Sequence, residues 1–600
     1  MKLVPASLRV VKEEIIDLLR IDIPAALMVA LMLLTFLPTI ARYADNAALL
    51  HTFVDDEPLI TMELDGMTEW PWGDPSTYID EYKHASHPVP PYWLNIRYDG
   101  IVYYGGLYPD LAMLLWVPLK AIGFKIFPTG PIVLRALSLL FSIFTVLAVY
   151  NFGRKHFGLF AGLFGALFLL TEYHFISIGT VVHPDSLLFF LTLLALPLCI
   201  RHAEEGTMES LVAAGIVAGL AQGAKMGGVL VAPIVAASVV YGGWGTSGFV
   251  PTVLRRGVIV SAVAMIVFFL TTPYAAVDPY FFKTWSVAAA LLSGQSPIEQ
   301  VTFLRWLATF VLKVSAPLLA AAGIAACAHY LLGRERLTLL FTLFLCAWVV
   351  LWYAQFQRFW VQPQYLIVSY ALVAIIGWSL VDRLIVLSPV MMPKAAVAIF
   401  AACAVAAMAV VKQDRITGAL SIPFSYFGWR EATRYQVGAW LAKNKHGVGE
   451  TVMFDTQAYF DPSDFTRQFP NGGPIHWTDL ARVKPDYFAL TVYGSGHWMG
   501  QKMAQQQSEQ WDPDYYNLRL YQDLLGTDPD KPTATNSIWY IATLQKFEPL
   551  PAAQQCEAGP LFTRAMVTCI GNAVLGEGIG PRGPAVWLFK LNPDGLRGRP

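Results

Sequence analysis

Charged residues are scarce in this sequence, and that scarcity is the first constraint on what the protein can be. Only 14% of its 600 residues are charged, whereas 55% are hydrophobic. Soluble globular domains usually carry about 25% charged residues, so this composition predicts a membrane protein. The net charge of −1 lacks the basic excess that nucleic-acid binding requires, so no nucleic-acid partner is expected.

Several motifs that would indicate a particular chemistry are also missing from the sequence. It contains no GxxxxGK[ST] loop, which argues against ATP-driven transport by this chain. It contains neither a CxxC pair nor an HExxH motif, so zinc is not indicated. Cys556 and Cys569 lie in polar sequence and leave a disulfide open if that region is extracytoplasmic. The other cysteines lie in apolar runs and are expected to pack as small apolar side chains: Cys199, Cys327, Cys346 and Cys403.

Long uncharged runs account for the hydrophobic composition. The first run is too long for a signal peptide and has no small-residue cleavage site, so it is interpreted as a retained anchor. We predict about eleven membrane-spanning helices. They cover residues 23–41, 132–150, 158–176, 185–200, 210–224, 226–243, 256–273, 305–331, 337–354, 362–381 and 393–411.

Lysine and arginine occupy every second connection between these runs. Cytoplasmic connections attract such residues, so the N-terminus is predicted to be cytoplasmic, and residues 42–131 and 412–600 to lie outside. Residues 108–127 are apolar enough to suggest a further span, but that span would invert every later connection. We interpret them as an interfacial helix on the outer face. The basic residues are Lys2, Arg9, Lys12, Arg20, Arg154, Lys155, Arg201, Arg255, Arg256, Arg334, Arg336, Arg383 and Lys394.

The composition changes after residue 411. Residues 429–443 have helical periodicity, and β-rich runs follow at 450–455, 486–492, 538–544 and 586–591. We therefore predict a mostly α-helical, polytopic membrane protein with a C-terminal α/β soluble domain. Its parts are a cytoplasmic segment (1–22), a transmembrane domain with a catalytic outer loop at 42–131 (23–411) and a periplasmic domain (412–600).

Carboxylates and cations gather on the side predicted to be outside. An acidic triplet, Asp55 to Glu57, opens the outer loop, and carboxylates beside a bilayer usually have a function. Departure of a lipid phosphate from a sugar needs cations, and an acceptor hydroxyl needs a carboxylate to take its proton. The candidate residues are Asp55, Asp56, Glu57, Tyr108, Asp110, Arg135, His183, Asp185, Lys225, Tyr274, Lys313, Arg358, Gln362 and Tyr365.

Structural explanations compete with these functional ones. Asp185 follows a proline at a helix start, where a carboxylate stabilises the helix dipole. His183 is interpreted as a structural hydrogen-bonding residue, and Lys225 could merely extend toward the membrane surface. Asp56 and Glu57 are also candidates for binding a divalent cation through oxygen ligands, which the sequence leaves open.

The order of several short motifs resembles that of the GT-C glycosyltransferases, and within them of family 39. That family includes protein O-mannosyltransferases and the bacterial aminoarabinose transferases of lipid A. The resemblance covers roughly residues 20–380. It is carried by the Asp56-Glu57 pair and by the segments VVHPDSLLFFL, GLAQGAKMGGVLVAP, TTPYAAVDPYFF and RFWVQPQYL.

The resemblance implies an inverting transferase with a GT-C fold and a polyprenyl-phosphate sugar as donor. The acceptor would be a cell-envelope lipid, glycan or protein on the outer face of a bacterial-type inner membrane. Asp56 would be the general base, with Glu57 beside it. Asp185 and Lys225 would line the cavity, and Arg358 would help to hold the phosphate.

The chain departs from the family pattern at two places. Tyr108-Pro109-Asp110 stands where the family often has His-Pro-Pro, and Asp55 precedes the usual acidic pair. Two other classes of function also stay open. A transporter or flippase of lipid-linked glycans would need polar residues through the middle of its spans. A glycan-binding scaffold would tolerate neutral residues in place of the first-loop carboxylates.

Overall fold

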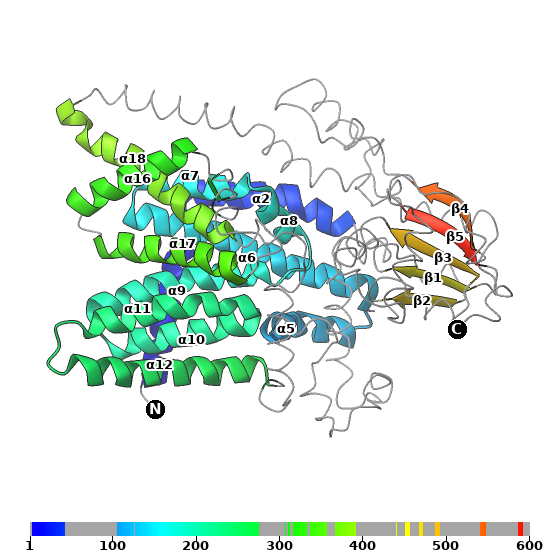
Figure 1. Cartoon of the computed structure of the whole chain (residues 1–600), viewed down its shortest axis with the longest axis horizontal. Helices are drawn as coiled ribbons and strands as arrows, with labels where there is room; N and C mark the ends of the chain where they lie inside the picture. Colours follow the sequence, from blue (N-terminus) through cyan, green and yellow to red (C-terminus); the bar gives the residue numbers. More distant parts are fainter. Residues whose placement is uncertain are drawn as a thin grey trace, which may run out of the picture. The chain divides into compact units, whose positions relative to one another are not determined.

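The computed structural model divides the chain into two compact units. One consists of Met1–Ile40, Leu59–Gly294 and Val301–Ala419, and the other of Ala41–Pro58, Gln295–Gln300 and Leu420–Pro600. The first unit is helical and the second contains a β-sheet (Figure 1). The structure describes residues 3–42, 105–124, 126–273, 275, 307, 310–311, 316–332, 336–356, 366–391, 440, 451–455, 467–471, 486–491, 541–547 and 586–591.

The helices of the first unit follow the apolar runs of the sequence. A helix satisfies all its backbone hydrogen bonds internally, which is what hydrocarbon surroundings require. The elements are α1 (Leu3–Leu18), α2 (Ile23–Arg42), α5 (Leu107–Ala121), α6 (Ile126–His156), α7 (Leu159–Leu170), α8 (Tyr173–Thr180), α9 (Asp185–Glu205), α10 (Met208–Ala224), the 3₁₀ helix η5 (Met226–Val231), α11 (Ala232–Gly243), α12 (Phe249–Thr271), α16 (Ala316–Leu332), α17 (Arg336–Phe356) and α18 (Ile367–Met391).

Four of the described helices are long and apolar enough to cross a membrane. They are Ile132–His156, Asp185–Glu205, Phe249–Thr271 and Ile367–Ile385. Shorter apolar helices overlap the predicted spans at 23–41, 210–224, 226–243, 305–331 and 337–354. The predicted span at 393–411 lies outside the described residues, so the count of about eleven spans remains a prediction. The chain is a multi-pass membrane protein.

Two predicted spans are interrupted in the structure. The run at 158–176 is a pair of helices, α7 and α8, bent by 73° at a short break. The polar residues Thr171 and Glu172 lie in that break, and the Thr171 hydroxyl donates to the Leu167 carbonyl 3.2 Å away, which ends α7. The run at 226–243 begins as η5 and becomes α-helical only at Ala232.

Helix α9 lies at the core of the helical unit. Every residue from Asp185 to Ile200 is buried, whereas α12 buries only Val260 and Phe268. Helices α6, α10 and α11 all pack against α9. The sequence from Leu187 to Ile200 is apolar except for Thr192, which bonds to its own helix. Helix α9 is therefore an apolar central helix whose functional groups can lie only near its ends.

The basic connections meet at one end of the bundle. Arg154, at the end of α6, pairs with Asp22 in the turn between α1 and α2. Arg256, on the first turns of α12, donates to the carbonyls of Gly242 at 2.6 Å and Gly206 at 2.9 Å. The first contact joins the end of α6 to the turn after α1, and the second joins the first turns of α12 to the end of α11 and the turn after α9.

A carboxylate from α18 also caps α7 at this end. The Asp382 side chain accepts hydrogen bonds from the backbone N–H groups of Phe160 at 3.1 Å and Ala161 at 2.8 Å. Gly158 precedes α7 with a φ of 124°, and a Cβ there would collide with the Asp382 carboxylate. The approach of α18 to the start of α7 therefore depends on a glycine at this position.

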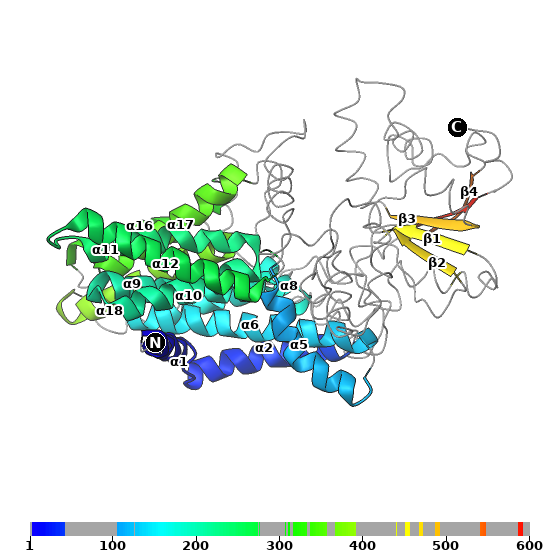
Figure 2. The ribbon, with the colours of Figure 1, turned by 90° about the horizontal axis from the view of Figure 1, so that it is seen from below.

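The second unit contains a five-stranded mixed sheet, with strands β1 (Thr451–Asp455), β2 (Arg467–Asn471), β3 (Tyr487–Thr491), β4 (Ile541–Phe547) and β5 (Val586–Leu591). Their order is β2-β1-β3-β5-β4 (Figures 1 and 2). Strand β1 is parallel to β2 and β3, whereas β5 is antiparallel to β3 and β4. The four β-rich runs found in the sequence correspond to β1, β3, β4 and β5. Except for Trp440, the predicted helix at 429–443 lies outside the described residues.

Candidate functional site

The start of α9 and the end of α10 bring together a buried ion pair. Lys225 Nζ lies 2.7 Å from Asp185 Oδ1, and the two side chains are 10% and 0% exposed. Lys225 has an extended backbone (φ −163°, ψ 153°) between α10 and η5, so the helix ends at the residue that carries the charge. The interpretation of Lys225 as a side chain that extends to the membrane surface is therefore wrong, because its charge is paired inside the protein.

His183 joins this pair from the turn before α9. Its Nδ1 atom lies 3.2 Å from Asp185 Oδ2 and 3.3 Å from the Asp185 backbone nitrogen. The backbone N–H of His183 donates to Ser138 Oγ on α6 at 3.2 Å, and its carbonyl accepts from the Ser186 hydroxyl at 3.1 Å. His183 therefore links the turn before α9 to α6 through hydrogen bonds, and its ring lies beside the Asp185 carboxylate.

Tyr108 extends the network to α5. Its hydroxyl lies 2.7 Å from the Leu134 carbonyl and 2.6 Å from Ser138 Oγ. Tyr108 and Arg135, the residue that follows Leu134 on α6, are both 1% exposed. The structure thus brings the predicted residues Tyr108, His183, Asp185 and Lys225 into one connected polar cluster, and it places Arg135 on the helix that carries Ser138.

Glycines allow α5 to approach this cluster. A Cβ on Gly105 would collide with the backbone of Gly223, and a Cβ on Gly223 would collide with the Thr271 side chain. The Gly106 backbone N–H donates to the Thr272 hydroxyl at 3.2 Å. The beginning of α5, the end of α10 and the end of α12 therefore meet next to Lys225.

The cluster lies at the end of the bundle opposite the basic connections. Asp185 is the first residue of α9, and Arg201 is near its last turn. Sixteen residues of α-helix separate them by about 24 Å, close to the thickness of a bilayer core of about 30 Å. Asp185 pairs with Lys225 at one end of this helix, and Arg201 pairs with Glu205 at the other, so charged side chains lie near both ends of α9 and its middle is apolar.

Asp110 lies on the first turn of α5, outside the spanning helices, and burial raises its pKa to about 7. A carboxyl whose pKa is higher in the folded state than in the unfolded chain favours folding at low pH, and that contribution is lost as the pH rises through the folded pKa. From about pH 5 to about pH 8 the loss should reach about 3 kcal/mol.

We therefore expect the melting temperature of the parent protein to fall relative to that of Asp110→Asn as the pH rises over that range. The measurement is thermal unfolding of both proteins in nanodiscs at a series of pH values. Parallel curves for the two proteins would contradict the raised pKa.

Two buried polar residues of this region were not singled out from the sequence. Ser138 bonds to both Tyr108 and His183, and Glu172 lies buried at the break between α7 and α8. A signal for Ser138 was present, because Arg135, Ser138, Ser142 and Thr145 recur at helical spacing along an otherwise apolar helix. No comparable periodicity marks Glu172.

The remaining candidates lie outside the described residues. Within the described part of the chain, no group of three or more His, Cys, Asp or Glu side chains is placed to hold a metal ion. The candidate cation site on Asp56 and Glu57 is not among those residues and remains a prediction. The candidates outside the described part are Asp55, Asp56, Glu57, Tyr274, Lys313, Arg358, Gln362 and Tyr365.

Comparison with known proteins supports the resemblance found in the sequence. Residues 113–272 match the family model described as dolichyl-phosphate-mannose-protein mannosyltransferase. This segment includes Arg135, His183, Asp185 and Lys225. Among curated proteins, no sequence matches the chain.

Several solved structures are similar to the chain at low sequence identity. The oligosaccharyltransferase of Archaeoglobus fulgidus, tethered to an acceptor peptide that contains the NVT sequon, is 12% identical with a TM-score of 0.50, covering 94% of this chain and 88% of that chain. The same organism's AglB, in complex with an inhibitory peptide and a dolichol-phosphate, is 11% identical with a TM-score of 0.48 and the same coverage. ArnT from Cupriavidus metallidurans, bound to undecaprenyl phosphate, is 15% identical with a TM-score of 0.41, covering 70% and 71%. The family match over residues 113–272 and the similar fold of the oligosaccharyltransferase agree with the resemblance to GT-C membrane glycosyltransferases drawn from the sequence.

Proposed function

We propose that this protein is a membrane glycosyltransferase that moves a sugar from a polyprenyl-phosphate donor to a hydroxyl-bearing acceptor. The observation that carries the proposal is the buried Asp185–Lys225 pair, which lies inside the segment that matches the mannosyltransferase family model. A buried ion pair in an apolar bundle is costly to desolvate and is therefore a candidate for function rather than a stabilising contact.

In the proposed reaction, Asp56 accepts the proton of the acceptor hydroxyl as the oxygen attacks the anomeric carbon. The bond between that carbon and the phosphate oxygen breaks, and its electron pair leaves with the polyprenyl phosphate. Attack opposite the leaving group inverts the configuration. Glu57 lies beside the base in the sequence, and the acceptor is a lipid, a glycan or a protein of the cell envelope.

Cations of the cluster would stabilise the leaving phosphate. Negative charge develops on the phosphate oxygen as the bond breaks, and positioned cations lower the free energy of that transition state. Lys225 is held by Asp185 at 2.7 Å, which fixes its ammonium group before the donor arrives. We assign Arg135 and Arg358 to the same task, with Lys313 as a further cation. Tyr274, Gln362 and Tyr365 are proposed to contact the substrates.

We further propose that the site opens on the outer face of a bacterial-type inner membrane, with the N-terminus in the cytoplasm and the C-terminal domain in the periplasm. Support comes from α9, whose charged residues Asp185 and Arg201 are separated by about 24 Å of apolar helix, close to the thickness of the bilayer core. The middle of α9 is apolar apart from Thr192, whereas α6 carries the polar residues Ser138, Ser142 and Thr145, so release of lipid phosphate is what separates a transferase from a flippase.

The test is incubation of the purified protein in nanodiscs with a panel of polyprenyl-phosphate sugars, followed by detection of released polyprenyl phosphate. We expect release with at least one donor, and only when a suitable acceptor extract is present. Parallel reactions with a chelator measure whether a divalent cation is needed. Movement of an intact lipid-linked sugar across a vesicle membrane, without release of lipid phosphate, would support the flippase instead.

A further inference from the structure

Helix α1 forms a layer of its own across the bundle. It runs across the direction of α9 to α12 in Figure 1 and is seen nearly end-on in Figure 2. It packs against α6, α9 and α10. Four residues separate α1 from α2, which begins at Ile23 and enters the apolar run. A short helix that crosses the bundle helices beside the start of a spanning helix lies at the level of the membrane surface.

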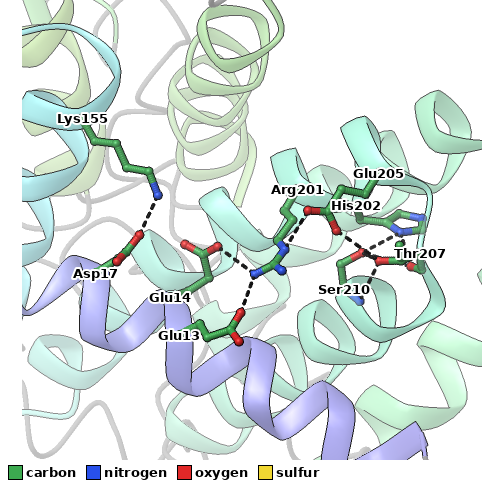
Figure 3. Close-up of polar contacts among 9 residues, drawn as sticks. All are labelled: Glu13, Glu14, Asp17, Lys155, Arg201, His202, Glu205, Thr207 and Ser210. Carbon is green, nitrogen blue, oxygen red and sulfur yellow. Dashed lines mark hydrogen bonds and ion pairs between the residues drawn. The ribbon is translucent and has the colours of Figure 1, made fainter.

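One flank of α1 forms ion pairs with other helices of the protein. Arg201 of α9 lies 3.1 Å from Glu13 and 3.6 Å from Glu14, and it also pairs with Glu205 at 3.0 Å. Lys155, at the end of α6, lies 2.8 Å from Asp17. Figure 3 shows the Glu13, Glu14 and Asp17 side chains of α1 meeting Lys155 and Arg201 of the bundle. All the carboxylates of α1 are therefore paired with cations of the bundle.

The seam of the helix that faces the bundle is buried. Its side chains are Ser7, Val10, Val11, Glu14 and Leu18. They repeat at spacings of three and four residues, which places them on one side of the helix. Burial of this seam and pairing of the carboxylates together fix the rotation of α1 about its own axis.

The opposite flank carries exposed apolar and basic side chains. Val4, Leu8 and Ile16 are 54%, 51% and 58% exposed. Arg9 and Lys12 are also exposed and, within the described part of the chain, neither forms an ion pair. We call these five residues the apolar–basic strip. The docking of α1 on the bundle thus separates its charges, with the acidic side chains on the flank that pairs with bundle cations and the apolar–basic strip on the other flank.

We propose that the apolar–basic strip docks on the anionic headgroups and upper acyl chains of the adjacent membrane leaflet. Apolar side chains flanked by lysine or arginine are the pattern with which surface helices bind anionic bilayers. Each such cation contributes about fivefold to the partition onto an anionic surface. A second protein as partner would not explain why the strip directly precedes a membrane-spanning helix. The proposal does not depend on glycosyl transfer.

The test compares the full-length protein in nanodiscs of phosphatidylcholine with nanodiscs that also contain phosphatidylglycerol. Hydrogen–deuterium exchange of residues 3–18 should be slower by about fivefold or more in the anionic discs. Arg9→Gln with Lys12→Gln should remove that difference while leaving the exchange of α9 unchanged. Leu8→Ser should reduce the difference in part, because it removes an apolar contact with the acyl region.

A matched control tests whether the effect belongs to α1. Arg255→Gln with Arg336→Gln removes two exposed cations from the first turns of α12 and α17, and it should keep the full difference in exchange. Equal exchange of residues 3–18 in both kinds of nanodisc would overturn the proposal. Loss of the difference in the control variant would also overturn it. So would equal protection by inorganic phosphate in phosphatidylcholine discs.

Discussion

Asp56→Asn is expected to lower the rate of sugar transfer by about 10²–10⁴-fold, the usual contribution of a general base. The amide of asparagine keeps the shape of the side chain but cannot accept the proton of the acceptor hydroxyl. Because the donor is bound elsewhere in the proposed site, its KM should change little. The measurement is the initial rate of polyprenyl phosphate release at several donor concentrations.

A matched control comes from the same predicted loop. Asp65→Asn makes the same chemical change nine residues away, at a position with no proposed role, and it should retain the parental rate. The melting temperature of both variants shows whether the fold is kept. A folded Asp56→Asn protein with an undiminished rate would refute the assignment of the base.

The buried Asp185–Lys225 pair should show the largest effect on stability. Removing one partner leaves the other charge buried without compensation, which typically costs about 3–5 kcal/mol. We therefore expect Asp185→Leu and Lys225→Met each to lower the unfolding midpoint strongly. The double variant should recover most of the loss, because apolar side chains can replace a buried ion pair at little cost. The midpoints are measured by thermal unfolding in nanodiscs.

Transfer activity separates a functional pair from a structural one. The stable double variant should be inactive if Lys225 stabilises the leaving phosphate, and it should stay active if the pair only holds α9 and α10 together. The exposed Lys155–Asp17 pair, with its charged atoms 2.8 Å apart, serves as the control. Its Lys155→Gln and Asp17→Asn variants should each cost less than about 1 kcal/mol, since solvent screens exposed ion pairs.

Much of the helical unit could be predicted from the sequence. Because burying charge is costly, apolar runs indicate buried or membrane-spanning helices, and basic segments indicate the connections between them. The run at 185–200 became α9, and the run at 210–224 became α10. The breaks at Thr171 and Met226 were not predicted, because a hydropathy average does not register one or two polar residues inside an apolar run. Helix α1 was described only as a cytoplasmic segment, since its apolar residues are interleaved with charged ones.

Strand β2 shows a different limit of sequence interpretation. Its sequence, RQFPN, has few residues with a preference for strands and contains Pro470. It is nevertheless a strand because it occupies the edge of the sheet, where a proline can be tolerated. Pairing with β1, rather than local preference, decides the conformation of this segment.

For the site, the sequence predicted which residues are involved, but it did not predict which of them contact one another. Asp185, Lys225 and His183 were proposed from their positions beside the ends of apolar runs. That Asp185 would pair with Lys225, and that Ser138 would connect His183 to Tyr108, depends on how α5, α6, α9 and α10 pack. Packing across thirty or more residues of chain leaves no local pattern in the sequence.

Substitutions at Gly158 and Asp382 are expected to be coupled, because the two residues are in contact. Any side chain at position 158 would need the carboxylate at position 382 to be shortened, and shortening it would remove the acceptor for the first amides of α7. A substitution at either residue alone should therefore be destabilising, although more than two hundred residues of chain separate them. In distant relatives the two positions should therefore change together or not at all.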